Sequence, residues 1–545
     1  MSDIKEILSG ICPEATFVEG GENLQVNVPE EKWHDFAKQL KEDKRLEFDV
    51  LTAVVGMDWK ETVGVMYYLT STSRGWDLLE VKVEAKDRKD PFIHTVSDLW
   101  KVALFQEREV YDFFGIRFIN HPDMRRMFLR NDWKGFPLLK DYNTDAELNP
   151  IPLEDEKDED DTCTYVEDEK GKIKRIPGKV FAPEDYVVNI GPQHPSTHGV
   201  MRFRASVEGE TVKKVDVVSG YIHRGIEKLC EGLGYPQILH FTDRMDYMSA
   251  HQNRHCLCAC IEKAMGLEIP RRAQVIRVMM DELMRISSHL LAFGCTAMDL
   301  GATTAFFYGF REREQVLDIF EKTCGARMSM NYNVIGGVMA DIHPDFKKDV
   351  KALIDIMPER LKEYHTVFSK NIIAKNRLKG VGMLPKEDAV NYAVTGPSGR
   401  GSNWSCDTRK VRPYSIYSEL DFNEVLEDGC DSYARYMVRM REIEESCKIL
   451  DQLVDKIPEG DIRALNVPKV VKLPVGHWYH QVEASRGAFG VYIESDGTKN
   501  PYRMHFQSPC FNLVGVMDLC CRGNMIADLI TIGAALDFVI PDIDR

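Results

Sequence analysis

Short apolar runs alternate with longer helical patterns along the first 110 residues. Residues 48–55, 65–70 and 78–83 are rich in β-branched and aromatic side chains, which are typical of strands. Residues 31–42 and 97–110 instead repeat apolar side chains at the three- and four-residue steps of a helix. This mixture predicts a small α+β domain at the start of the chain.

Helical spacing dominates the later part of the chain. In residues 273–291 the apolar positions recur at helical steps: Val275, Ile276, Met279, Met280, Leu283, Ile286 and Leu290. Comparable patterns occupy residues 303–324, 345–368, 423–453 and 511–533. They predict a mostly helical second domain with β segments at its edges, so we expect the whole chain to belong to the α+β class.

A strongly acidic run separates the two patterns. In residues 154–161, EDEKDEDD, seven of the eight side chains are acidic, and such a run cannot pack because carboxylates stay hydrated and repel one another. We therefore predict an N-terminal domain at 1–150, a linker at 151–182 and a second domain at 183–545. The alternative is an acidic surface loop inside a single domain.

Composition narrows the class of protein. The 545 residues suffice for two or three domains, and 44% hydrophobic with 29% charged residues is typical of globular proteins. No apolar run approaches the ~18 residues of a membrane-spanning helix, so we expect membrane association only through partners. A net charge of -16 disfavours nucleic-acid binding. The 14 cysteines, together with an N-terminus unlike a secretion signal, favour reduced thiols in a cytoplasmic compartment.

Several common chemical motifs are missing from the sequence. It contains no phosphate-binding loop, no dinucleotide fingerprint and no CxxC pair. Cys258 would face away from Cys256 and Cys260 on a helix, so these thiols cannot share one metal ion. His251 and His255 share a helical face without an evident third ligand, and we expect them to be packed or hydrogen-bonded. No metal site is predicted.

One segment has the features of a functional loop. Residues 189–200, NIGPQHPSTHGV, contain two prolines and two glycines, which break regular structure after a strand-like run. They present His194 and His198 four residues apart. A loop that carries two histidines favours a site over a core position.

A series of motifs gives this loop a family context. They occur in the following order: GPQHPSTHGVMR at 191–202, GYIHRGIEK at 220–228, DRMDYMS at 243–249, ELMRISSHLLAFG at 282–294, CGARM at 324–328 and DTRKVRPY at 407–414. Together they resemble the 49 kDa subunit of respiratory complex I over nearly all of residues 183–545. Residues 107–142 are similar to its 30 kDa subunit. The two subunits are fused in some bacteria, and the acidic run lies where that junction belongs.

The resemblance implies a role in quinone reduction at the peripheral arm of a proton-pumping NADH:quinone oxidoreductase. It assigns the proton donors of the quinone headgroup to His198 and Tyr247, and the carboxylate that orients the imidazole to Asp299. Tyrosine keeps its proton to about pH 10 and histidine changes charge near pH 6.5, so both types can donate to a reduced quinone. It also implies cofactor contacts for His194, Arg224 and Arg244.

The cofactor in question is the terminal iron–sulfur cluster, which the resemblance assigns to a neighbouring subunit. Fixed positive charges at Arg224 and Arg244 would raise the potential of such a cluster. The alternative for each arginine is a structural ion pair. This chain is expected to hold no cofactor of its own.

The resemblance also implies the surroundings of the chain. Its partners would be the other complex I subunits, above all the cluster-bearing B-like subunit and the membrane subunit with the quinone channel. It would lie peripherally on the cytoplasmic side of the bacterial inner membrane. The sequence leaves open whether electrons come from NADH or from a donor such as ferredoxin, and which quinone is used. Ser329 replaces a family histidine linked to a pH-dependent cluster potential, so we do not expect that coupling; a low-potential quinone such as menaquinone would fit.

Two other interpretations compete with this one. The 49 kDa subunit resembles the large subunit of nickel–iron hydrogenases, whose metals need four thiolates. Those thiolates would fall at Asp246, Ser249, Val539 and Asp542, and none of these is cysteine. The third possibility is a non-catalytic scaffold, which suits the first domain, where no catalytic residue is predicted before residue 183.

Overall fold

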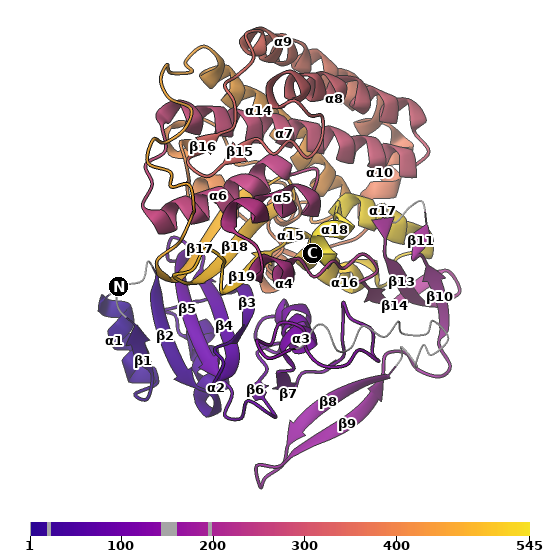
Figure 1. The fold of residues 1–545 in the computed structure, drawn as a ribbon. Coiled ribbons are helices and arrows are strands. Elements are labelled where there is room, and N and C mark those ends of the chain that lie inside the picture. The colour runs from indigo at the N-terminus through magenta and orange to yellow at the C-terminus, as the bar shows by residue number, and fades with distance from the viewer. Residues whose placement is uncertain (1, 19–22, 143–160, 195–198) are drawn as a thin grey trace. The chain divides into compact units, whose positions relative to one another are not determined.

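The computed structural model describes residues 2–18, 23–142, 161–194 and 199–545 (Figure 1). The chain forms two compact units. Unit 1 comprises Met1–Val188, Val218–His223 and Val390–Ala393, and unit 2 comprises Asn189–Val217, Arg224–Ala389 and Val394–Arg545. Each unit is described by itself below.

Unit 1 contains a five-stranded sheet with two helices packed on it. The strand order is β1 (Thr16–Val18), β2 (Leu24–Pro29), β5 (Asp77–Glu84), β4 (Val63–Ser71) and β3 (Val50–Asp58). The β2–β5 pair is parallel and the other pairs are antiparallel. The helices of the unit are α1 (Ser2–Ile11), α2 (Glu30–Glu42) and α3 (Ala103–Phe114). Helix α2 packs on β2 and β5, and α3 packs on β3, where Gly56 leaves room for the ring of Phe114.

A second sheet of unit 1 includes part of the predicted linker. Its order is β6 (Phe92–His94), β7 (Arg117–Ile119), β8 (Asp161–Glu167) and β9 (Ile173–Lys179), with β8 and β9 forming a hairpin. We expected an irregular linker at 151–182, but Thr162, Tyr165 and Val166 favour strand, and the Cys163 side chain is buried. The rest of the acidic run, through residue 160, lies outside the described residues.

Unit 2 is mostly helical, as the periodicity predicts. Its larger helices are α5 (Tyr235–Met245), α6 (Ala250–Met265), α7 (Arg271–Asp299), α8 (Thr303–Cys324), α9 (Phe346–Tyr364), α14 (Ser432–Val454) and α17 (Ile526–Leu536). The shorter helical segments are α4 (Ile226–Glu231), η2 (His365–Ser369), α10 (Ile372–Leu378), α11 (Lys386–Asn391), α12 (Gly396–Arg400), α13 (Thr408–Val411), η3 (Tyr417–Glu419), α15 (Pro509–Gly515), α16 (Met517–Cys521) and α18 (Ile540–Asp544). Helix α7 contacts α6, α8, α14 and α17, so it forms the axis of the unit (Figure 1).

The strands of unit 2 lie at the margins of this helical body. β17 (Val475–Ala484), β18 (Gly487–Asp496) and β19 (Arg503–Gln507) form an antiparallel sheet on which α6 packs. β10 (Tyr186–Ile190), β13 (Arg202–Glu208) and β14 (Thr211–Val218) form another, in that order; residues 186–188 and Val218 are counted with unit 1. Two short pairs are β11 (Gln193–His194) with β12 (Gly199–Val200), and β15 (Asn333–Val334) with β16 (Gly337–Val338). The predicted α+β class is confirmed.

Among the described residues, no helix is both long and apolar enough to span a bilayer.

Candidate functional site

Tyr247 lines a cavity of about 220 Å³ inside unit 2. It stands in the short connection between α5 and α6 and is half-buried. Most of the cavity wall is apolar and comes from α7, α17 and the segment after it, with Leu291, Leu529 and Phe538 as examples. The ionisable side chains of the wall are Tyr247, Cys295, Arg486 and Asp537. A largely apolar space with a few polar groups is the usual form of a small-molecule site.

A buried guanidinium organises the charges at this cavity. Arg486 forms ion pairs of 3.1 Å with both Asp246 and Asp537, and it donates to the Ser288 hydroxyl at 3.1 Å. Burial alone would lower the pKa of Arg486, but the two carboxylates outweigh it and hold that pKa above its ordinary value. The guanidinium therefore stays charged, and each carboxylate beside it has a cationic partner.

The phenol of Tyr247 is kept protonated by this environment. Burial raises its pKa because a phenolate is poorly solvated there, and the Asp246 charge adds to the effect. The Arg486 charge opposes them without reversing the direction. At neutral pH the side chain is thus a hydrogen-bond donor.

Local hydrogen bonds hold the Tyr247 segment in place. The Asp246 side chain accepts from the Met248 amide at 3.0 Å, and its carbonyl accepts from the Ser249 amide at 3.0 Å. The Ser249 hydroxyl accepts from the Ser485 amide at 3.4 Å, which ties the segment to the turn that carries Arg486. These hydrogen bonds therefore hold the Tyr247 segment and the turn that carries Arg486 in fixed positions relative to each other.

Asp299 is the last residue of α7, and it is half-buried. Leu291 and Cys295, which line the cavity, precede it by eight and four residues. Residues four apart share a helical face, so Asp299 follows Cys295 by about one turn of α7. Among the described residues, Asp299 is not one of those that line the cavity, and its role beside His198 stays a prediction.

The described ends of the predicted histidine loop pair with each other. In β11 and β12, His194 is paired with Gly199, and His194 is exposed. Gly191 has φ +93°, and a side chain there would collide with the Met201 carbonyl, so the close approach requires glycine. His198 lies outside the described residues, and its position next to Tyr247 stays a prediction.

The structure brings Arg224 and Arg244 together on the surface of unit 2. The Arg224 Nη2 donates to the Arg244 carbonyl at 2.9 Å, and both side chains are exposed. Within the described part of the chain neither guanidinium forms an ion pair, and a cofactor contact of either one stays a prediction. Partial desolvation lowers the pKa of Arg224; Arg244 contributes to the shift, and Asp544 opposes it.

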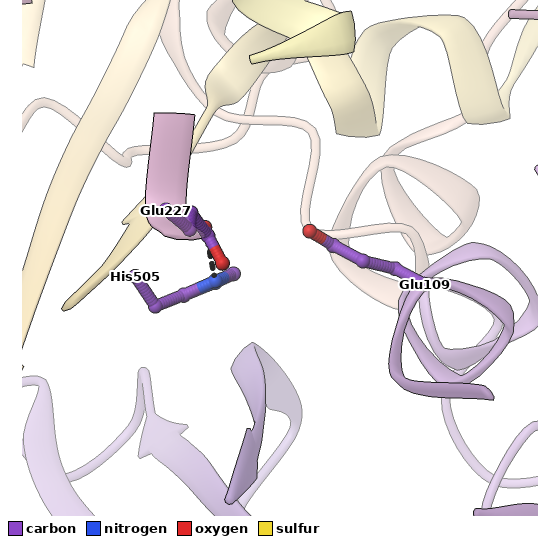
Figure 2. A group of neighbouring side chains, drawn as sticks. All are labelled: Glu109, Glu227 and His505. Atoms are coloured by element: carbon purple, nitrogen blue, oxygen red, sulfur yellow. Dashed lines mark ion pairs between the residues drawn. The ribbon is translucent and has the colours of Figure 1, made fainter. Parts of the chain in front are cut away.

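The Arg224 segment is anchored to the core through Glu227. Figure 2 shows Glu227, in α4, beside His505 in β19, and the two form an ion pair of 2.9 Å. Arg503 adds a second ion pair to Glu227 at 2.7 Å. The Arg224 amide donates to the carbonyl of Arg545 at 3.4 Å. These contacts therefore fix the position of the segment that carries Arg224.

Comparison with known proteins gives the family. Residues 299–545 match the family model described as "Respiratory-chain NADH dehydrogenase, 49 Kd subunit", and residues 26–148 match the one for the 30 Kd subunit. The chain is 53% identical over 523 residues to the C/D subunit of NADH-quinone oxidoreductase from Phocaeicola vulgatus, covering 96% of this chain and 99% of that protein. The chain belongs to the family of NADH-quinone oxidoreductase C/D subunits.

Other relatives agree with this assignment. The C/D subunit from Bacteroides fragilis is 52% identical over 94% of this chain and 98% of its own length. The D subunit of NADH-quinone oxidoreductase from Bacillus cytotoxicus is 43% identical over 66% of this chain and 99% of its own length. The resemblance to fused complex I subunits is confirmed, and so is the role of this C/D subunit as part of an oxidoreductase complex with other complex I subunits as partners.

The motifs of the C/D subunit indicated Tyr247, but they did not indicate Arg486 or Asp537. Arg486 stands in ASRGAFG, which has the pattern of a hairpin turn, and an arginine in a turn is ordinarily solvated. The sequence offered only the glycine beside it. In the structure, Gly487 has φ +142° and no room for a side chain against Thr395. A glycine this crowded indicates a buried turn.

The residues considered as metal ligands have other roles in the C/D subunit. Cys256 and Cys260 lie against the strand carbonyls of β17 and β18. His255 Nδ1 is 2.6 Å from the Asp281 carboxylate, so its expected hydrogen-bonded role is confirmed. Burial lowers the pKa of His251 to about 3, which keeps that ring neutral.

Proposed function

We propose that this subunit forms the quinone-reduction site of its complex at the Tyr247 cavity. The observation that carries the proposal is a neutral phenol in an apolar cavity beside a buried, charged arginine. A quinone headgroup is an apolar ring with two carbonyl oxygens, so it needs this combination of apolar contact and hydrogen-bond donors. An apolar cavity of roughly 150 Å³ holds benzene, so about 220 Å³ accommodates one ring.

Quinone reduction takes two electrons and two protons. In the proposal, Tyr247 donates a hydrogen bond to one carbonyl oxygen and supplies a proton as negative charge develops there. His198 serves the other oxygen, and Asp299, the last residue of α7, orients its imidazole. Loss of the imidazole proton would remove the positive charge that faces Asp299, which can start a conformational response in the complex.

The proposed electron source is the terminal iron–sulfur cluster of a neighbouring B-like subunit. When that subunit is bound, its cluster supplies electrons, while this chain supplies charge and protons. The exposed side chains of Arg224 and Arg244 would stabilise the reduced cluster, and His194 would contribute to the same contact. In this proposal the chain binds no cofactor of its own.

The proposed partners and location follow from the same assignment. The quinone tail would enter through a membrane subunit that holds the quinone channel, so this chain would meet the membrane only through partners. The chain would lie on the cytoplasmic side of the bacterial inner membrane. The names of the relatives support NADH as the electron donor of the complex.

Replacing Tyr247 tests the proposal. In the assembled complex, Tyr247→Phe keeps the ring and removes the donor, so quinone reduction should fall roughly 10²-fold. NADH oxidation with ferricyanide, which does not use the quinone site, should be unchanged. Tyr332→Phe is the matched control, because that phenol donates only to the Ala340 carbonyl, at 2.7 Å, and lies away from the cavity.

The scaffold interpretation gives the opposite outcome. If the reacting groups lay on another subunit, Tyr247→Phe and Tyr332→Phe would reduce quinone at the same rate as the unchanged complex. That result would remove the proposed site.

A further inference from the structure

Asp542 is a buried acid close in sequence to a residue that lines the Tyr247 cavity. It lies in α18 with no exposed surface, three residues after Val539, which lines the cavity. Its Oδ2 accepts a hydrogen bond from the Ser508 hydroxyl. Its Oδ1 is buried and has no hydrogen-bond partner in the described part of the chain. A buried carboxylate oxygen without a partner is costly, and it needs a functional explanation.

The charges around Asp542 come from three other segments. Asp246, before α6, repels its negative form, whereas Arg545 at the C-terminal end and the Cys510 thiol in α15 favour it. The guanidinium of Arg486 is already shared between Asp246 and Asp537. Asp542 itself forms no ion pair in the described part of the chain. Of the carboxylates Asp246, Asp537 and Asp542, it is therefore the one without a cationic partner among the described residues.

These surroundings leave the Asp542 proton easily exchanged near neutral pH. Burial and the Asp246 charge raise its pKa to about 6, against the opposing effects of the Ser508 hydroxyl, the Cys510 thiol and the Arg545 charge. A further negative charge nearby would raise that pKa again, because like charges disfavour ionisation. Asp246 and Asp537 differ from Asp542 in that each has Arg486 as an ion-pair partner.

We propose that Asp542 takes up a proton when negative charge enters the Tyr247 cavity and releases it when that charge leaves. The inference rests on the proposed function of the cavity. No electrons pass through Asp542: its carboxylate and one solvent proton become a carboxylic acid, and the reverse step returns the proton to solvent. This proton compensates charge and is not one of the two that become part of the quinol. Asp542 is a positioning residue that acts through Asp246 and Arg486.

Infrared difference spectroscopy on the assembled complex tests this directly. The reduced-minus-oxidised spectrum should contain the C=O band of a newly protonated carboxyl at pH 7. The band should shrink toward pH 5, because Asp542 is then protonated before reduction. Asp542→Asn should abolish the band, and Asp542→Glu should restore it at a shifted frequency.

A second variant keeps the test decisive if Asp542→Asn does not assemble. Ser508→Ala removes a hydrogen bond that favours the carboxylate, so the pH at which the band reaches half its size should rise by about one unit. The matched control is Ser446→Ala, which removes a similar buried hydroxyl-to-carboxylate bond, 2.6 Å long, from Glu282 away from the cavity. It should leave the band unchanged.

The outcomes separate this inference from the proposed function. A band that persists in Asp542→Asn, or that does not move in Ser508→Ala, overturns the role of Asp542 while the Tyr247→Phe result stands. If Tyr247→Phe reduces quinone at the normal rate, the cavity itself is wrong, and the Asp542 inference is overturned with it.

Discussion

A phenol that is partly buried in a cavity loses its proton only at high pH, and Tyr247 is such a phenol. Its pKa is raised by burial, and the Asp246 charge acts in the same direction. The Arg486 charge beside it attracts developing negative charge without giving up a proton, since its own pKa is held high. One side chain can therefore deliver a proton while its neighbour stabilises the charge.

Asp542 gives a prediction about stability and pH. Its pKa is raised to about 6 in the folded chain, from about 4 in an unfolded one. The neutral form is favoured in the fold, so its stabilisation is complete below pH 4 and is lost as the pH rises through about 6. By pH 8 the loss amounts to about 3 kcal/mol.

The variant Asp542→Asn cannot ionise and should avoid this loss. Calorimetry of the assembled complex should show that its melting temperature falls less between pH 5 and pH 8 than that of the unchanged complex. The Ser446→Ala variant should keep the full pH dependence. Parallel curves for Asp542→Asn and the unchanged complex would mean that the carboxyl has an ordinary pKa.

At the residue scale, the sequence indicates candidate site residues but not the residues that surround them in the fold. Tyr247, Arg224 and Arg244 stand in motifs with family parallels, and their roles, like that of Asp299, stay predictions. Arg486 could not be predicted, because its partners Asp246, Asp537 and Ser288 come from distant parts of the chain. Burial of a charged group depends on such long-range contacts, and no local pattern encodes them.

Helix α7 shows that an apolar pattern predicts where a helix lies but not which of its charged residues are buried. Its apolar steps predicted a helix at 273–291, and the structure extends it to Arg271–Asp299. An amphipathic pattern would put the charged positions in water, yet Arg277, Glu282 and Arg285 are buried. Glu282 and Arg285 pair with each other at 3.3 Å within α7. Further partners lie on other elements: Arg277 pairs with Glu262 at 2.6 Å, and Arg409 reaches Glu282 at 3.1 Å.

The hairpin of β11 and β12 gives a prediction at the same scale. Gly191→Ala places a side chain at φ +93°, where it also meets the Met201 carbonyl. The loop that carries His194 and His198 would shift, so both the melting temperature and the rate of quinone reduction should fall.

Gly209→Ala is the matched control for that change. Gly209 has φ +61° and open space around the added side chain, so it carries only the left-handed strain of about 1 kcal/mol. Thermal unfolding and quinone-reduction assays of the two variants, each in the assembled complex, provide the comparison. Equal effects would show that the approach of Gly191 to Met201 does not position the loop.

At the scale of the whole molecule, the two apolar patterns predicted the α+β class, and the ordered motifs predicted the family. The part that departed from expectation was residues 161–179, expected as linker and found as the hairpin of β8 and β9. The acidic composition nearby obscured a strand pattern, because charge runs outweigh a few β-branched residues in any window. The predicted boundaries at 150 and 183 stay predictions.

The cavity itself could not be predicted from the sequence. Its wall combines residues from Ile190 to Val539, and it exists because α7, α17 and the Tyr247 segment leave space between them. A motif can indicate that a tyrosine takes part in chemistry, whereas only the packing of the whole unit shows which space that tyrosine lines.

Photolabelling of the assembled complex with a quinone whose headgroup carries the reactive group is the most direct test of the central claim. Mass spectrometry should locate the label on residues that line the cavity, with Tyr247, Leu291 and Cys295 as the expected positions. An excess of unlabelled quinone should prevent the labelling. If the label instead lies on residues away from this cavity, or on another subunit alone, the quinone headgroup does not bind where we propose.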